Sequence, residues 1–200
     1  TTSGIVTATI DPTTTIATLA TLDADEGDTN HLTITIREAD KTACTAEQLN
    51  SVSAATSLGV NLVNLEALAA STISDLEDLF TAMDDGGFTN FSDIATIAVS
   101  GATVDATNVL SLVDSFDTLN GENTTAFSLA SEANIQIDSS EISSFLSNES
   151  GNRLTIDDQD IEVNSASTIS VGSANLLNAV TSGTITASID TSETVDTLSL

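Results

Sequence analysis

The sequence is poor in the residues that most often carry chemistry. Its 200 positions include no tryptophan, no tyrosine, one cysteine and one histidine. A single cysteine excludes a disulfide within the chain, and Cys44 with His31 forms neither a metal-ligand set nor a convincing nucleophile–base pair. Acidic neighbours such as Asp157 and Asp158 lack aromatic side chains that would hold a sugar. We therefore expect a protein that is not an enzyme and has no small-molecule substrate.

Basic residues are equally scarce. Arg37, Lys41 and Arg153 stand against 30 acidic residues, which gives a formal net charge of -27. A surface of this kind repels the phosphates of nucleic acids and of anionic lipids, so we expect no nucleic acid partner. No apolar run approaches the roughly 20 residues of a membrane span, so we expect no membrane insertion.

The negative charge also destabilises a compact chain unless salt or bound cations screen it. An extracellular, saline, calcium-containing medium would supply both, which favours a secreted protein at the cell surface. Simple solubility is the alternative explanation. Any targeting segment is expected upstream, in a longer parent chain.

What the chain has is a repeated phrase. Residues 3–19 return as residues 182–198, at an offset of 179 residues and with 9 of 17 positions identical. Most of the other positions exchange like for like, as Val6 does with Ile185. Self-similarity at a fixed spacing is the signature of a repeat protein. The apolar residues make up 40% of the chain and are mainly Ala, Ile, Leu and Val, which suits a regular stack.

The hydrophobic pattern predicts strands alternating with helices. Capping residues mark several helix starts, among them Thr45 with Gln48, Ser74 with Glu77, Thr103 and Asp138, and Asp11-Pro12 marks another. The predicted strands are 4–10, 32–36, 59–63, 94–99, 126–129, 135–137 and 154–163. The predicted helices begin near 12, 45, 74, 103, 138 and 172.

Within the 179-residue period we distinguish three sub-repeats, 3–56, 57–116 and 117–181, and the start of the next repeat at 182–200. Each reads strand, helix, acidic loop, strand, helix, with about 30 residues per strand–helix step. This pattern predicts an α/β repeat protein, an open solenoid of βα units with parallel strands. Strands stack at about 4.8 Å but helices need about 8–10 Å. The solenoid must therefore curve, carry helices on both sides, or have some helices reduced to short turns.

Neither end of the sequence carries the polar cap that closes natural arrays. We expect residues 1–200 to be a tandem-repeat segment, which either continues into a longer chain or associates end to end with further copies.

Three segments carry a family resemblance: 182–189 (SGTITASI), 174–181 (ANLLNAVT) and 46–50 (AEQLN). They resemble the repeats of giant cell-surface proteins of marine unicellular cyanobacteria, in which the pattern acidic-Ala-x-x-Leu-Asn-x-Leu-x-x-x-Thr-x-Gly-x-Val-Thr recurs. The segments Thr56-Ser57-Leu58-Gly59 and Phe116-Asp117 depart from the Thr-x-Gly join. The resemblance implies a surface protein; some members of that family are linked to swimming motility, and others are regarded as adhesive or protective.

One acidic loop is the best candidate for a metal. Asp23, Asp25, Glu26, Asp28 and Asn30 place five oxygen-bearing side chains in eight residues, and calcium takes 6–8 oxygen ligands. The loop lacks the full length and the distal Glu of an EF-hand, and solvated turns are the alternative explanation. Weaker groups of the same kind are Asp84, Asp85, Asn90 and Asp93; Asp114, Asp117, Asn120 and Glu122; and Asp157, Asp158 and Asp160.

These observations favour a structural extracellular repeat protein that forms a fibre, filament or surface layer, with calcium stiffening its acidic loops. The alternative is the stalk or binding region of an adhesin or phage-like fibre. A binding region requires an exposed apolar or aromatic patch, to which Phe88 or Phe91 could contribute.

Overall fold

The computed structural model describes residues 5–22, 30–121 and 124–192. The chain divides into two compact units. The first comprises Thr1–Ala98 and Ser115–Thr125, and the second comprises Val99–Asp114 and Ala126–Leu200.

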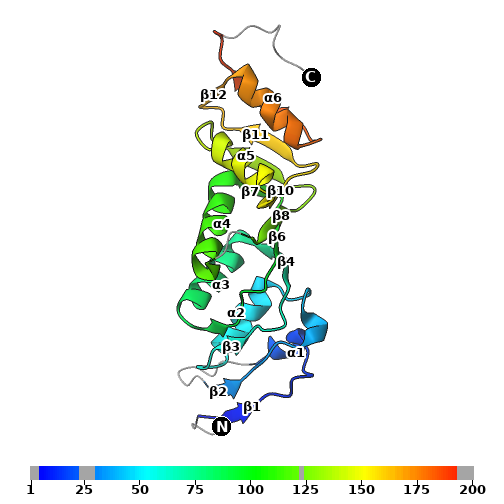
Figure 1. Cartoon of the computed structure of the whole chain (residues 1–200), viewed down its shortest axis with the longest axis vertical. Coiled ribbons are helices and arrows are strands. Elements are labelled where there is room, and N and C mark those ends of the chain that lie inside the picture. Colours follow the sequence, from blue (N-terminus) through cyan, green and yellow to red (C-terminus); the bar gives the residue numbers. More distant parts are fainter. Residues whose placement is uncertain (1–4, 23–29, 122–123, 193–200) are drawn as a thin grey trace. The chain divides into compact units, whose positions relative to one another are not determined.

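Strands and helices alternate along the first unit (Figure 1). We call each stretch of strands together with the helix that follows it a step. The elements of the first unit are β1 (Thr7–Thr9), α1 (Ile16–Leu19), β2 (His31–Thr33), the 3-10 helix η1 (Glu38–Asp40), α2 (Ala46–Ala54), β3 (Val60–Asn61), β4 (Ala67–Thr72), α3 (Ile73–Asp84), β5 (Phe88–Thr89), the beginning of β6 (Thr96–Ser100) and the end of α4 (Ala106–Asn120).

The second unit continues the alternation. Its elements are the end of β6, β7 (Thr103–Asp105), the first part of α4 (Ala106–Asn120), β8 (Ala126–Leu129), β9 (Asn134–Ile137), α5 (Ile142–Ser150), β10 (Leu154–Thr155), β11 (Asp160–Val163), β12 (Thr168–Ile169), α6 (Val171–Val180), β13 (Ile185–Thr186) and β14 (Ser188–Ile189).

The strand pairs within each unit are parallel, as predicted, and each joins neighbouring steps. In the first unit β1 pairs with β2, Thr7 lying opposite His31, and β3 pairs with β5. In the second unit β8 pairs with β10, β12 pairs with β14, and a sheet has the strand order β13-β11-β9-β7. Because a parallel pair needs a crossover of a dozen or more residues, the helix of each step fits between the strands it connects.

The register of the four-stranded sheet places side chains of similar character opposite one another, in columns that cross the strands. Val104, Ile135 and Ile161 lie opposite one another and are buried, and Ile185 extends this column. The neighbouring column consists of Asp105, Gln136, Glu162 and Thr186, so that each acidic side chain is separated from the next by a neutral one. This spacing reduces like-charge repulsion between directly opposed residues.

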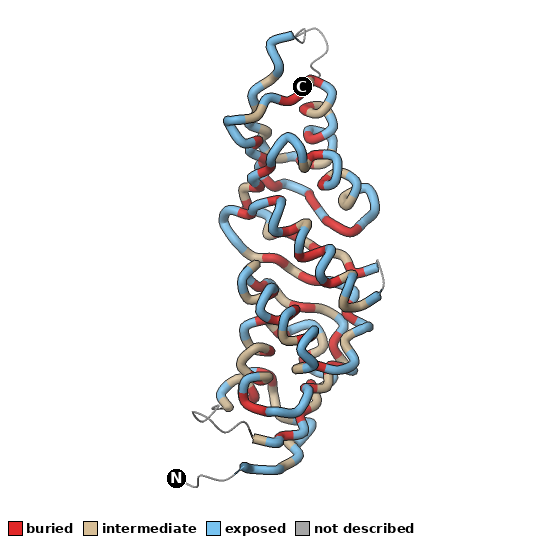
Figure 2. The backbone as a smooth tube through the Cα atoms, turned by 90° about the vertical axis from the view of Figure 1, so that its left-hand side faces the viewer, coloured by how far each residue is buried: buried red, intermediate tan, exposed pale blue. Residues whose placement is uncertain are grey.

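Period-two burial therefore builds the interior of the second unit, and the same alternation holds in the first. Leu32, Ile34 and Ile36 are buried, while His31 and Thr33 between and beside them are exposed. Figure 2 shows buried and exposed positions following one another along the chain. The helices add their apolar faces: Leu76, Leu79, Phe80 and Met83 of α3 are buried, as their spacing predicts.

Helix α2 confirms the predicted capping box. The Thr45 hydroxyl accepts the N–H of Gln48 at 3.3 Å, and the Gln48 side chain accepts the N–H of Thr45 at 3.1 Å. Three other predicted helix starts are displaced. Helix α3 begins slightly earlier than predicted, because Thr72 rather than Ser74 caps it. Helices α4 and α5 begin later than predicted, at Ala106 and Ile142, because the strand β7 and a turn occupy residues that the sequence pattern assigned to them.

The helix predicted from Asp11-Pro12 to residue 22 is largely wrong. Asp11 instead accepts the N–H and the hydroxyl of Thr13, which forms a side-chain-closed turn. Helix α1 begins only after Thr15, its N-cap, and extends over four residues. Of the three ways to reconcile strand and helix spacing, a helix shortened to a single turn holds for this step.

The number and the lengths of the predicted strands were partly wrong. The structure adds β4, which the sequence reading left unassigned, and shortens the strand predicted at 59–63 to β3. The chain turns after β3 because the Asn61 side chain accepts the N–H of Val63 at 3.1 Å. The strand predicted at 154–163 is divided into β10 and β11. Steps therefore hold up to three short strands before each helix.

Candidate functional site

Successive steps are bonded to each other through buried threonines. The Thr56 hydroxyl donates to the carbonyl of Leu32 at 2.9 Å and accepts the N–H groups of Leu32 and Leu58. The Thr181 hydroxyl donates to the carbonyl of Gln159 at 2.6 Å and accepts the N–H of Gly183. Thr56 and Thr181 are both buried and each bonds to a step 22–24 residues earlier.

These bonds give the Thr-x-Gly join a physical role. The threonine joins two steps, and the N–H two residues later closes the turn onto its hydroxyl. At Gly183 a Cβ atom would lie 2.3 Å from the carbonyl oxygen of Gln159, so only glycine permits this approach. Thr56 makes the equivalent bonds with Leu58 in place of the glycine, although its segment departs from the sequence pattern.

A partly buried ion pair in the second step holds a carboxylate that also bonds to the first step. Arg37 donates to both carboxylate oxygens of Asp40, Nε to Oδ2 at 2.8 Å and Nη2 to Oδ1 at 2.9 Å. Asp40 also accepts the N–H of Ile16, the first residue of α1, at 2.7 Å. The hydrogen bonds from Arg37, with the bond from Ile16 and the guanidinium charge, lower the pKa of Asp40 against the effect of burial. This carboxylate therefore caps the helix of the preceding step.

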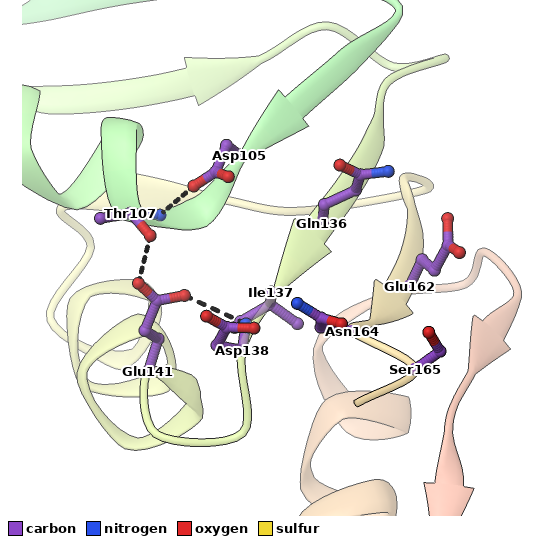
Figure 3. Close-up of a pocket in the computed structure, with 9 residues that line it drawn as sticks. All are labelled: Asp105, Thr107, Gln136, Ile137, Asp138, Glu141, Glu162, Asn164 and Ser165. Atoms are coloured by element: carbon purple, nitrogen blue, oxygen red, sulfur yellow. Dashed lines mark hydrogen bonds between the residues drawn. The ribbon is translucent and has the colours of Figure 1, made fainter. Parts of the chain in front are cut away.

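An acidic pocket of about 240 Å³ lies in the second unit, at the carboxyl ends of β7, β9 and β11 (Figure 3). Because the strands are parallel, the residues that end each strand meet at one edge of the sheet. The pocket is lined by Asp105, Thr107, Gln136, Ile137, Asp138, Glu141, Glu162, Asn164 and Ser165.

Hydrogen bonds within the chain already engage part of this lining. Asp105 accepts the N–H of Thr107 at 2.8 Å, and the Thr107 hydroxyl donates to Glu141 (Figure 3). The second oxygen of Glu141 accepts the N–H of Asp138 at 3.1 Å. Asp105 therefore caps the start of α4, and Glu141 closes the turn that precedes α5. The pocket therefore offers mainly negative charge, and the Thr107 hydroxyl in its lining is already bonded to Glu141.

Sequence reasoning missed this pocket because its residues come from three successive steps. No local motif connects Asp105, Gln136 and Glu162, which lie opposite one another only through the strand register. The one signal in the sequence is that Gln136 and Glu162 lie near the ends of predicted strands, whereas Asp105 falls in a segment that was predicted to be helical. It becomes readable only once the pairing offset is known.

The loop predicted to bind calcium lies almost entirely outside the described residues, since Asp23, Asp25, Glu26 and Asp28 fall in residues 23–29. Asn30 is described. Its side-chain oxygen accepts the N–H of Val6 at 3.3 Å, and its carbonyl accepts the N–H of Ser57 at 2.8 Å. Asn30 therefore bonds to the steps before and after it.

The weaker acidic groups are dispersed among structural roles. Asp84 ends α3 and Asp85 is its C-cap. Asn90 donates to the side chain of Asn61, and Asp160 accepts the N–H of Thr184 at 2.6 Å. Among the described residues, no group of three or more Asp, Glu, His or Cys side chains is arranged to hold a metal ion.

Cys44 is fully buried, as expected for a small apolar side chain. Burial, together with the charge of Asp40, raises the pKa of its thiol to about 12. We expect the native protein to react with a thiol reagent roughly a thousandfold more slowly than free cysteine at neutral pH, since the thiolate is the reactive species. A colorimetric thiol assay with and without denaturant checks this. Rapid labelling of the native chain would contradict the burial of this side chain.

No helix within the described part of the chain is long and apolar enough to cross a membrane. No protein-family model, curated protein or solved structure matches the sequence or the fold.

Proposed function

We propose that this chain is a structural repeat protein whose steps stack into one open solenoid and form an extracellular fibre, filament or surface layer. The observation that carries the proposal is the parallel pairing of each step with its neighbour in both units, from Thr7 opposite His31 to Ile161 opposite Ile185. Stability in such a chain is the sum of step and interface terms, so the array extends without a closing contact.

The hydrogen bonds between steps support a structural role. Thr56, Thr181 and Asp40 each connect backbone groups of neighbouring steps. Gln159 adds a fourth connection, since its buried amide donates to the carbonyls of Leu129 and Ala130. These polar side chains serve the stack itself rather than a ligand.

The burial of the aromatic residues favours a structural role over a binding role. Phe88, which could have contributed to an exposed patch, is 3% exposed, and Phe91 is half-buried. Phe80 packs against Phe116, with ring centroids 5.1 Å apart. The stalk or binding region of an adhesin remains the second candidate, since a stalk needs the same stacking.

Charge supports an extracellular, saline setting for this proposal. Arg37 and Lys41 are held in ion pairs with Asp40, Glu38 and Glu66. The large excess of carboxylates therefore depends on salt or divalent cations for screening. We include calcium binding at residues 23–30 in the proposal, and its basis is the composition of that loop alone.

Electron microscopy tests this function. We expect the protein in calcium-containing saline to form elongated particles or fibres with a regular axial period. Chelation of calcium is expected to fray them, because unscreened carboxylates repel one another. Magnesium at the same ionic strength is the matched control. Compact particles under every condition would overturn the proposal, and fibres indifferent to chelation would remove calcium from it.

A further inference from the structure

The two copies of the repeated phrase have the same local structure. In the first copy the Asp11 side chain accepts the N–H of Thr13 at 2.9 Å and its hydroxyl at 2.8 Å. In the second copy Asp190 accepts the N–H and hydroxyl of Ser192 at the same two distances. These bonds lower the pKa of both carboxyl groups. Positions 179 residues apart are therefore structurally equivalent.

The two copies, however, pair along opposite edges. In the first copy Val6 accepts the N–H of His31 at 2.8 Å, and Ile10 donates to the carbonyl of Thr33 at 3.0 Å. In a parallel strand, alternate residues direct their backbone groups to opposite neighbours. Positions 6, 8 and 10 therefore face β2, which belongs to the following step.

In the second copy the alternate set of positions makes the backbone hydrogen bonds to the neighbouring strand. The carbonyl of Thr184 accepts the N–H of Ile161 at 2.9 Å, and Asp190 donates to the carbonyl of Ile169 at 3.0 Å. Thr184 and Asp190 are equivalent to positions 5 and 11, so this edge faces the preceding step. One strand of this sequence can therefore pair on both edges at once, because the two sets of backbone groups do not overlap.

Each copy has one edge without a partner strand among the described residues. The inward side chains at these edges are incompletely covered. Ile10 and Ile189 are half-buried, whereas Leu32 in β2 and Ile161 in β11 are 6% and 1% exposed. A further strand on the outer edge would complete the burial of these side chains. Ile161 in β11, which has a partner strand on each side, is buried in this way.

We propose that the outer edge of residues 184–190 is a pairing surface for the β2 strand of a second copy of this chain, in place of that copy's own β1. In the resulting contact Thr186 lies opposite His31 of the second copy, as the equivalent Thr7 does within one chain. The contact repeats an interface that the fold already contains, and it continues the strand ladder from one copy to the next. This inference rests on the proposed function, of which it is the joining step.

Disulfide trapping tests the register. One full-length protein carries His31→Cys and the other carries Thr186→Cys, and the two are mixed under mild oxidation. Cross-strand neighbours lie within the Cα separation that a disulfide spans, whereas a shift of two residues exceeds it, so we expect at least about tenfold more heterodimer than with Thr33→Cys and Thr186→Cys. Equal yields would overturn the proposal.

Proline variants test the edge. Ala187→Pro removes an N–H that faces outward and has no hydrogen-bond partner among the described residues, so we expect an unchanged fold but loss of the trapped heterodimer. Ala187→Ser keeps the N–H and is the matched control. Ala8→Pro in the His31→Cys protein weakens its own β1–β2 pairing and is expected to increase the yield. A yield indifferent to Ala187→Pro would overturn the proposal.

The outcomes separate this inference from the proposed function. Fibres that form without the in-register disulfide would overturn the strand pairing and leave the structural function intact. Trapped heterodimers that never extend into fibres would confirm the pairing and contradict the function.

Discussion

Replacing Asp40 by alanine is expected to lower the free energy of unfolding by about 2 kcal/mol, the typical contribution of hydrogen bonds to a charged group, because Arg37 stays 30% exposed and can be hydrated. The change leaves the guanidinium without its fork of acceptors and the N–H of Ile16 without its cap. Denaturant titration measures the loss. Glu66→Ala is the matched control, since its ion pair with Lys41 is largely exposed and is worth at most about 1 kcal/mol.

The contribution of the Asp40 carboxyl group to the free energy of unfolding depends on pH. Its pKa is lowered in the folded chain, mainly by the hydrogen bonds from Arg37. Its contribution is therefore complete above the unfolded pKa of about 3.9 and is lost as the pH falls through the folded pKa. Because protonation of other carboxylates also relieves repulsion, the informative quantity is the stability difference between wild type and Asp40→Asn. A difference that stays constant below pH 4 would contradict the role of Asp40.

Replacing Thr56 by valine is expected to cost about 2 kcal/mol, the penalty of leaving buried backbone groups without hydrogen-bond partners. The hydroxyl serves the carbonyl and N–H of Leu32 and the N–H of Leu58. Valine matches threonine in shape, so packing is preserved while these bonds are lost. Denaturant titration again measures the effect.

Thr56→Ser is the control for the second prediction, because it keeps the hydroxyl and loses only a methyl group. It is expected to retain most of the stability. If Thr56→Ser were as destabilising as Thr56→Val, the methyl group rather than the bonds between steps would be responsible. Thr181→Val extends the test, with loss of hydrogen-exchange protection expected at residues 183–190.

The strand–helix alternation and the parallel pairing were predictable because both follow from short-range patterns. Alternating apolar residues marked β2 and β9, and the spacing of Leu76, Leu79 and Met83 marked α3. The capping box at Thr45 identified α2 because a cap needs only residues close in sequence.

Boundaries failed where two local structures competed. Asp11 is a good helix cap, but its carboxylate closes a turn with Thr13 instead. Thr103 is also a good cap, but it forms part of β7, opposite Asn134. At Thr103 the pairing with a neighbouring step decided the outcome, and a single sequence window does not contain that neighbour. At Asp11 the helix cap and the turn are both local structures, and the turn prevailed.

The candidate sites, too, depend on residues that lie far apart in the sequence. The role of Asp40 depends on Ile16, 24 residues earlier, and the acidic pocket depends on a register that spans three steps. No pattern of residue types in one segment predicts either. The repeat at 179 residues was visible in the sequence, but its opposite pairing edges required the hydrogen bonds on each side.

The most direct test of the central claim is diffraction from oriented fibres of the protein. If the steps stack into an open solenoid, parallel strands lie across the fibre and repeat along its axis. The account predicts a meridional reflection at about 4.8 Å, the spacing of paired strands. Fibres without this reflection, or a protein that stays compact and monomeric under every salt and calcium condition, would contradict it.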